Sequence, residues 1–203
     1  LIVNHAEALS LNIDPDESTT SAGESQTYSA VAEDEYGNTW DVTDETSWSD
    51  DVGEGSSWSG STMTVTEAGE WTVTGEYDGL SDTATLYVEH AEAQTIDIEP
   101  AESTIIAGES QDYTAAAEDG YGNTWDVTDE MTWSDDVGEG SSWSGSKIIV
   151  TNSGEWMITG EYEGISDTAA LKVETAELAL VEISPSVEQT IDAGDELDFD
   201  ARA

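Results

Sequence analysis

Apolar side chains recur at every second residue in short runs along this chain, with polar residues between them. Such alternation is typical of β-strands that bury one face. We therefore expect a strand in each of these runs: residues 9–13, 28–32, 63–65, 71–77 and 84–88. A further strand carries Trp48. No segment shows a sustained helical period.

Turn residues separate these runs. Pro15 ends the first run, and the second ends at a turn at 35–38. The segments 67–69 and 78–79 hold Gly next to Ala or Asp and mark two more turns. About seven short strands with turns between them predict a Greek-key β-sandwich of the immunoglobulin-like type.

An internal repeat sets the domain organisation. Residues 6–90 and 91–175 align with 59 identities in 85 positions, including the unbroken runs YGNTWDVTDE and WSDDVGEGSSWSGS. We expect each copy to be one sandwich, so the fold class is all-β with tandem immunoglobulin-like repeats of 85 residues. Residues 1–5 match the last strand of a preceding repeat, and 176–203 match the opening strands of a further, incomplete one. The sequence thus predicts an excerpt from a longer array.

The charge of the chain is extreme, with 47 Asp and Glu against 3 Lys and Arg and a formal net charge of -44. Such a charge often indicates disorder, but eight Trp and seven Tyr among alternating Val, Ile and Leu favour a folded protein. Molar salt screens the self-repulsion, so we interpret the acidity as adaptation to high salt in a salt-loving organism. It disfavours nucleic acid and anionic membranes as partners and favours cations. The chain has no Cys, and no apolar run is long enough for membrane insertion.

The second repeat resembles the bacterial immunoglobulin-like (Big-type) repeat family, and its variants are similar to repeats of haloarchaeal cell-surface proteins. The residues that carry the resemblance are Ile98, Pro100, Ala107, Gly108, Glu109, Trp133, Gly154, Trp156, Ile158, Gly160, Tyr162, Gly164, Ala169, Leu171 and Val173. The resemblance covers the whole chain. It implies an extracellular location at a cell surface or in a surface filament, and it specifies the fold more closely than the role.

Each repeat carries four Trp residues. We expect Trp48 and Trp71, with their equivalents Trp133 and Trp156, to fill the sandwich core. Trp40 and Trp58, with Trp125 and Trp143, stand in Gly-, Ser- and Asp-rich settings typical of loops. For these four we favour packing in the core or between repeats, and stacking on a glycan remains the alternative.

Carboxylates concentrate beside the strand that carries Trp48. Asp50, Asp51 and Glu54 recur as Asp135, Asp136 and Glu139, and oxygen ligands at short spacing are what Ca²⁺ requires. No EF-hand spacing is present, however, and a chain this acidic places carboxylates everywhere. We favour a solvated surface, with a site for Ca²⁺ or another cation as the alternative. No other cofactor is expected.

Nothing in the sequence indicates catalysis. His5 and His90 occupy equivalent places after a predicted last strand, and the third equivalent is Thr175, so we assign them to linkers. The chain has no nucleophile elbow, phosphate-binding loop or dinucleotide fingerprint. We therefore expect that the protein is not an enzyme.

Three functions remain open. The leading hypothesis is a structural repeat segment of an extracellular surface, stalk or filament protein, whose partners are neighbouring copies or repeats of itself. The second is an adhesin or glycan-binding module that uses loop Trp and acidic residues. The third is a fibre of a virus that infects halophiles.

Overall fold

The computed structural model describes residues 4–177, 182–184, 190, 196, 198 and 200–202. These residues form strands and turns with one short 3₁₀ helix, so the chain is an all-β protein. The chain divides into two compact units. One is built mainly from the first repeat, and the other mainly from the second repeat and the residues that follow. Every described sheet within residues 8–174 draws its strands from one repeat.

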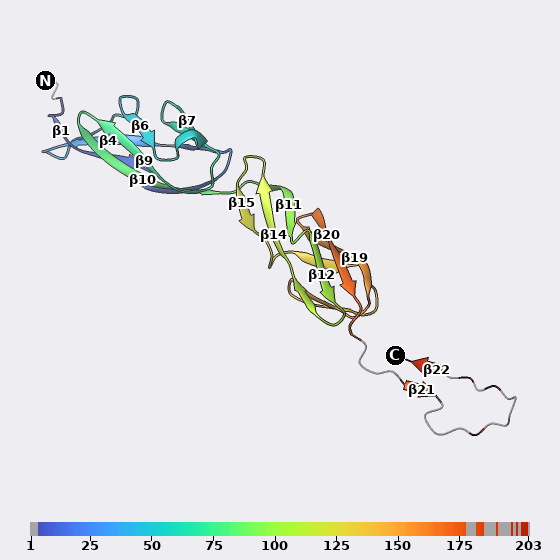
Figure 1. Cartoon of the computed structure of the whole chain (residues 1–203). Coiled ribbons are helices and arrows are strands. Elements are labelled where there is room, and N and C mark those ends of the chain that lie inside the picture. The colour runs from blue at the N-terminus through green and yellow to red at the C-terminus, as the bar shows by residue number, and fades with distance from the viewer. Residues whose placement is uncertain are drawn as a thin grey trace. The chain divides into compact units, whose positions relative to one another are not determined.

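The first repeat contains ten strands (Figure 1). They are β1 (Ala8–Asp14), β2 (Glu17–Ser21), β3 (Ser25–Thr27), β4 (Ser29–Asp34), β5 (Thr39–Asp41), β6 (Ser47–Asp50), β7 (Ser56–Ser59), β8 (Thr62–Val65), β9 (Gly69–Tyr77) and β10 (Leu80–Glu89). The 3₁₀ helix, Gly53–Gly55, lies between β6 and β7.

These strands form two layers. One layer is the four-stranded sheet β2-β10-β9-β6, in which β2 is parallel to β10 and the other neighbours are antiparallel. The other layer consists of two three-stranded sheets, β1-β4-β5 and β3-β8-β7. Only Tyr28 separates β3 from β4, so one run of chain passes from one small sheet into the other. The result is the sandwich that the alternation predicts.

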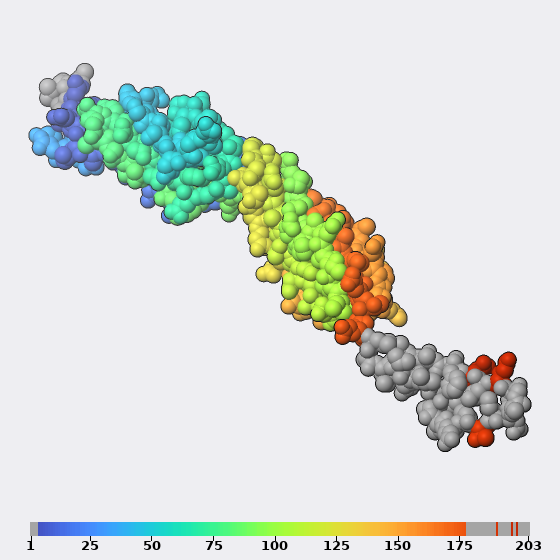
Figure 2. Space-filling view, viewed as in Figure 1, coloured from blue at the N-terminus to red at the C-terminus, as the bar shows by residue number. Residues whose placement is uncertain are grey.

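The core lies between the layers and takes alternate residues from β1, β4, β8, β9 and β10. Its most buried side chains are Tyr28, Ile13, Met63, Leu86, Val42, Val65 and Val73. Burial of each such side chain contributes about 1.5–3 kcal/mol. Figure 2 shows the outer surface of the first repeat, coloured from blue to green.

The second repeat reproduces this arrangement. Its strands are β11 (Ala93–Glu99), β12 (Glu102–Ile106), β13 (Ser110–Asp112), β14 (Thr114–Asp119), β15 (Thr124–Asp126), β16 (Thr132–Asp135), β17 (Ser141–Ser144), β18 (Lys147–Val150), β19 (Gly154–Tyr162) and β20 (Ile165–Glu174). They form the sheets β12-β20-β19-β16, β11-β14-β15 and β13-β18-β17, in the same order as in the first repeat.

The structure corrects two details of the expected strands. Each repeat has ten strands where about seven were expected, because short polar segments such as Glu17–Ser21 also pair. Leu9, which belongs to the apolar alternation of its run, is 67% exposed. A β-bulge between Ala8 and Ser10 shifts the register of β1 at this point.

The terminal segments are described only in part. Strands β21 (Glu182–Ser184) and β22 (Asp200–Arg202) pair antiparallel, with Ile183 opposite Ala201. Most of the expected further repeat at 176–203, and residues 1–3 of the expected preceding strand, lie outside the described residues. The predicted repeat boundaries at 6–90 and 91–175 stay predictions.

Candidate functional site

Three aromatic rings pack together at one end of the first repeat's core. Trp48 on β6 and Trp58 on β7 stack with ring centroids 5.9 Å apart and an interplanar angle of 15°. Tyr28 tilts against both, at 5.8 Å from Trp48 and 6.1 Å from Trp58. Both indoles are half-buried and pack on the core. Their rings contact protein aromatic groups, which reduces the ring area available for a ligand.

Asp50 holds this cluster in place. Its carboxylate accepts a hydrogen bond of 2.7 Å from Trp58 Nε1 and one of 2.9 Å from the Val52 backbone N–H. The Ser56 hydroxyl donates one further hydrogen bond, shared between the two carboxylate oxygens at 2.9 and 3.0 Å. A carboxylate that accepts from an indole and a backbone amide fixes both the ring and the following turn.

The second repeat repeats the cluster. Trp133 and Trp143 stack at 5.9 Å with Tyr113 beside them, and Asp135 accepts a 2.7 Å hydrogen bond from Trp143 Nε1. Trp58 and Trp143 therefore lie on strands, and not in the loops that the sequence suggested.

The four aspartates among the acidic residues considered for a cation have other partners. Asp51 accepts a 2.7 Å hydrogen bond from the Thr72 backbone N–H, and Asp136 accepts an equal one from Met157. Glu54 is exposed on the 3₁₀ helix, and Glu139 is exposed in the equivalent loop. Over the residues that the structure describes, no group of three or more His, Cys, Asp or Glu side chains is placed to hold a metal ion.

Trp71 and Trp156 lie at the rim of the core. Trp71 is half-buried, packs on the core and donates through Nε1 to the Glu67 carbonyl at 2.9 Å. Trp156 donates in the same way to the Asn152 carbonyl at 3.1 Å. A Cβ atom at Gly69 would lie 3.0 Å from the Trp71 ring, so this glycine leaves room for the indole.

The remaining Trp of each repeat stacks on a histidine. His5 lies 3.7 Å from Trp40 at an interplanar angle of 11°, and His90 lies 3.5 Å from Trp125 at 3°. Trp40 and Trp125 belong to strands β5 and β15. The predicted linker histidines thus pack on the repeat that follows them, and sequence patterns gave no signal of this stack.

A buried aspartate fixes the residue after each histidine. Asp34 accepts hydrogen bonds from the Asn38 side chain and from the backbone N–H groups of Ala6, Tyr36 and Asn38. The Asn38 side chain, more than these backbone groups, holds the pKa of Asp34 well below its ordinary value.

Asp119 plays the same part for Ala91 in the second repeat. Burial acts to raise the pKa of Asp119, but hydrogen bonds from Asn123, Ala91 and Tyr121 outweigh it and lower the pKa. In both repeats, then, the ionised carboxylate is the form that the fold binds.

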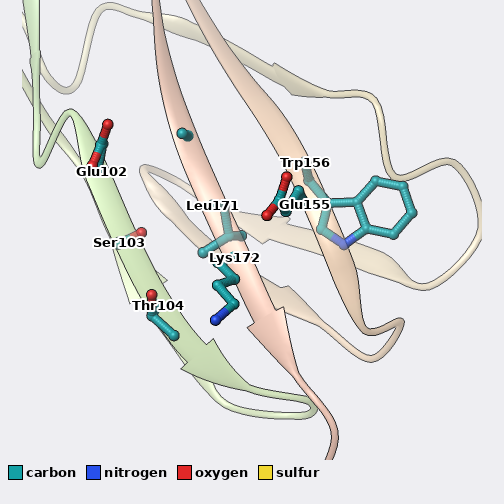
Figure 3. A pocket seen from close by; sticks show the side chains of 8 residues that line it. Glu102, Ser103, Thr104, Glu155, Trp156, Leu171 and Lys172 are labelled. Atoms are coloured by element: carbon teal, nitrogen blue, oxygen red, sulfur yellow. The ribbon is translucent and has the colours of Figure 1, made fainter.

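A shallow hollow opens on the second repeat, over the sheet β12-β20-β19 (Figure 3). It has a volume of about 510 Å³ and is lined by Glu102, Ser103, Thr104, Glu155, Trp156, Ala170, Leu171 and Lys172. A second hollow of about 390 Å³ shares Ala170 and Glu155 and extends to Met157. Sequence reasoning did not find this site.

The hollow holds one ammonium group and an excess of carboxylates. Lys172 forms an ion pair of 2.8 Å with Glu174, and this hydrogen bond raises the pKa of the lysine. In Figure 3 the Lys172 side chain lies between Thr104 on β12 and Glu155 on β19. The hollow therefore presents an ammonium group, carboxylates and apolar surface to whatever approaches it.

Comparisons with known proteins give structural neighbours and no sequence family. No protein-family model matches this chain, and no curated protein matches it significantly. A helix long and apolar enough to cross a membrane is absent from the described residues.

Three solved structures illustrate the likeness. The surface layer protein SbsC, domains 1–6, is 17% identical over 90% of this chain and 30% of its own, with a TM-score of 0.44. The N-terminal four Ig domains of Dscam1 isoform 6.44 are 10% identical over 84% of this chain and 47% of their own, with a TM-score of 0.42. Protocadherin Gamma B7 extracellular cadherin domains 1–4 are 12% identical over 95% of this chain and 59% of their own, with a TM-score of 0.45.

This chain spans less than two thirds of the length of each of these three structures. At these identities the likeness concerns the fold only.

Proposed function

We propose that this chain is a structural repeat segment of an extracellular surface, stalk or filament protein that works in high salt. The observation that carries the proposal is the use of the aromatic side chains within the repeats. Trp48 and Trp58 stack on each other, and Trp40 stacks on His5. For Trp40 and Trp58 the sequence favoured packing and left glycan stacking as the alternative, and both rings contact other protein rings.

The duplication supports the same role. The aromatic cluster, its Asp, and the His–Trp stack all occur twice with nearly the same geometry. Selection for one binding loop tends to make copies diverge, whereas the run WSDDVGEGSSWSGS, which includes the β6–β7 connection, is identical in both repeats. Uniform units are the expected product when length and stiffness are selected.

Adaptation to high salt is part of the proposal. The two ion pairs found among the described side chains, Lys147–Asp112 and Lys172–Glu174, are exposed and offset little of the charge of -44. Such a protein needs mobile cations for screening. A non-catalytic role, a surface location and self-association with neighbouring copies complete the proposed function.

The alternative roles differ in what they require. A glycan-binding adhesin needs an open aromatic face, and Trp58 contacts both Trp48 and Tyr28. Glycan-array binding that disappears in Trp58→Ala, with unchanged circular dichroism, would favour the adhesin. A fibre of a halophile virus would require the same packed sandwich repeats as the leading proposal.

Immunogold electron microscopy of the source cells and their viruses tests the proposed function. Antibodies raised against the folded repeats should label the cell envelope or filaments that extend from it. Labelling confined to virus particles would move the chain to the viral alternative. Labelling confined to the cytoplasm would overturn the proposal.

A further inference from the structure

A loop of the second repeat binds a turn of the first. The Asn123 side chain donates through Nδ2 to the Thr66 carbonyl at 2.9 Å, and its Oδ1 accepts from the Ala68 backbone N–H at 2.8 Å. Residues Ala115–Glu130 belong to the same compact unit as the first repeat, so the contact lies within one unit. One amide side chain therefore pairs with a backbone acceptor and a backbone donor, as a neighbouring strand would.

Tyr121 adds a second contact from the same loop. A Cβ atom at Gly23 would overlap the Tyr121 hydroxyl, so the tyrosine ring ends against the backbone of this glycine. Gly23 lies beside the turn that Asn123 binds, because its N–H donates to the Val65 carbonyl at 2.7 Å. We call residues 121–123, and their equivalents 36–38, the docking loops. Residues 66–68, and their equivalents 151–153, are the receiving turns.

Each repeat holds its own part of this contact in place. Asp119 accepts hydrogen bonds from Asn123 Nδ2 at 2.8 Å and from the Asn123 backbone N–H at 3.0 Å, which orients the amide. On the receiving turn, the Thr66 N–H donates to the Gly55 carbonyl at 2.8 Å. Groups that are already oriented lose less conformational freedom on binding, so a small contact is more effective.

The docking loop of the first repeat is the same but more exposed. Both docking loops read Tyr-Gly-Asn, and Asn38 Nδ2 donates to both oxygens of Asp34 at 3.1 and 2.9 Å. Asn38 is nevertheless exposed, whereas Asn123 is half-buried. Tyr36 is 74% exposed against 53% for Tyr121. The first repeat thus presents an anchored loop whose equivalent is partly covered in the second.

The receiving turns show the converse difference. Thr66 and Ala68 in the first repeat are half-buried, whereas Thr151 and Ser153 in the second repeat are exposed. Thr151 keeps the same backbone anchor, a hydrogen bond of 2.8 Å from its N–H to the Gly140 carbonyl. The turn is therefore formed in both repeats, and the partly covered one is the turn that a docking loop contacts.

The chemistry of the contact suits a repeated, acidic chain. Glu67 and Ala68 of the first receiving turn are replaced by Asn152 and Ser153 in the second. A loop that pairs with the backbone tolerates such changes, because every residue type at these positions keeps its carbonyl and N–H. The paired groups are also uncharged, so the contact adds no repulsion to a chain with a net charge of -44.

We propose that the Tyr-Gly-Asn loop is the site by which each repeat binds the repeat before it. For the second repeat the partner is the receiving turn at 66–68. Residues 36–38 are the same site, and their partner is the receiving turn of a repeat that precedes the first. The inference rests on the proposed structural role and deepens it, because it names the surfaces that link one unit to the next.

Amide hydrogen exchange of the full chain in molar KCl, followed by nuclear magnetic resonance, tests the contact. We expect Asn123→Ala to speed exchange of the Ala68 N–H at least about tenfold, because that group loses its acceptor. The matched control Asn38→Ala removes the same side chain, and the same bonds to an aspartate, from the other docking loop. It should leave the Ala68 rate unchanged. Near-ultraviolet circular dichroism checks that both variants keep their packed indoles.

A longer chain tests the docking loop of the first repeat. Residues 1–5 match 86–90, so one further copy of residues 6–90 replaces them without a change of period. In this extended chain Asn38→Ala should speed exchange of the N–H that corresponds to Ala68 in the added copy, again at least about tenfold. Asn123→Ala is now the control, because it should leave that N–H unchanged.

An Ala68 rate that Asn123→Ala leaves unchanged would overturn the inference, and so would an equal acceleration in Asn38→Ala. If Asn38→Ala had no effect on the added copy of the extended chain, the use of this loop by each repeat would be wrong. These results would leave the proposed surface role intact if the antibodies still label the envelope. Labelling confined to the cytoplasm would overturn that role whatever the exchange rates, so the two failures are distinguishable.

Discussion

Trp48 and its equivalent Trp133 give the first prediction. Each packs on its own stacked Trp and Tyr, so truncation leaves a void beside two aromatic rings. Full truncation of a core aromatic residue costs about 3–5 kcal/mol, and these indoles are half-buried. We expect Trp48→Ala/Trp133→Ala to lower the free energy of unfolding by about 2–3 kcal/mol per repeat, measured by denaturant titration in molar KCl.

The conservative variant Trp48→Phe/Trp133→Phe is the control for this experiment. It keeps an aromatic ring against Tyr28 and should recover more than half of the loss. An alanine variant within about 0.5 kcal/mol of the unmodified chain would show that the stack adds no stability.

Asp34 and Asp119 give a prediction about pH. Their folded pKa values are lowered, whereas an unfolded Asp titrates near 3.9. Their stabilisation is therefore complete above the unfolded pKa and is lost as the pH falls through the folded pKa. We expect Asp34→Asn/Asp119→Asn to be less stable than the unmodified chain at neutral pH, and this difference to shrink between about pH 4 and pH 2.

The measurement is the free energy of unfolding of both proteins from pH 7 to pH 2 in molar KCl. The difference between the two proteins is the useful quantity, because protonation of the many other carboxylates affects both alike. A difference that stays constant down to pH 2 would contradict the assignment of the lowered pKa to these two residues.

At this scale the sequence predicted residue types better than residue roles. For Asp50, Asp51 and Glu54 the sequence favoured a solvated surface and left a cation site as the alternative, yet Asp50 and Asp51 accept hydrogen bonds from an indole N–H and a backbone N–H. An aspartate suits both tasks. Which task it performs depends on which N–H groups the finished fold leaves without a partner, and local spacing does not carry that information.

The strands show where sequence patterns succeed and fail at the scale of elements. The alternation predicted β1, β4, β8, β9 and β10 because their inward residues are apolar. It missed β2, β3, β5 and β7, which are short and rich in Ser, Thr and Asp. These strands are defined by pairing with distant strands, as β2 pairs with β10, and not by their own hydrophobic pattern.

Gly75 on β9 gives a prediction for an element. It lies opposite Trp48, and a Cβ atom there would lie 3.0 Å from Ile13 Cγ2 and 3.1 Å from Thr46 Cγ2. Added methyl groups in a tight core cost about 1–3 kcal/mol. We expect Gly75→Ala to lower the unfolding free energy of the first repeat by that amount, because β9 must move away from β1.

The matched control is Ser49→Ala, an exposed position on the neighbouring strand β6. Its expected effect is below about 0.5 kcal/mol, measured by the same titration. If Gly75→Ala unfolded at the same denaturant concentration as Ser49→Ala, the close packing at β9 would be wrong.

At the scale of the whole molecule, charge and fold oppose each other. Several aspartates are used as hydrogen-bond acceptors, including Asp82 and Asp167, which accept from the backbone N–H groups of Ile13 and Ile98 on the opposite layer. The many exposed glutamates repel one another. The sandwich supplies cohesion, and the solvent must supply the screening.

The dependence of stability on salt follows from this opposition. Lowering the salt from about 1 M to about 0.01 M lengthens the Debye screening distance from about 3 Å to about 30 Å. Each carboxylate then repels charges across its whole repeat. We expect the near-ultraviolet circular dichroism of the packed indoles to be lost as salt is removed, and to return when it is restored.

The identity of the salt separates screening from specific binding. KCl, NaCl and tetramethylammonium chloride of equal ionic strength should restore the signal to similar degrees, because screening depends on ionic strength and not on a coordination site. If micromolar CaCl₂ restored the signal without any added KCl or NaCl, bound cations would be indicated instead of screening. A near-ultraviolet spectrum that is unchanged at about 0.01 M salt would show that the sandwich tolerates its own charge, and the high-salt interpretation would then have to be abandoned.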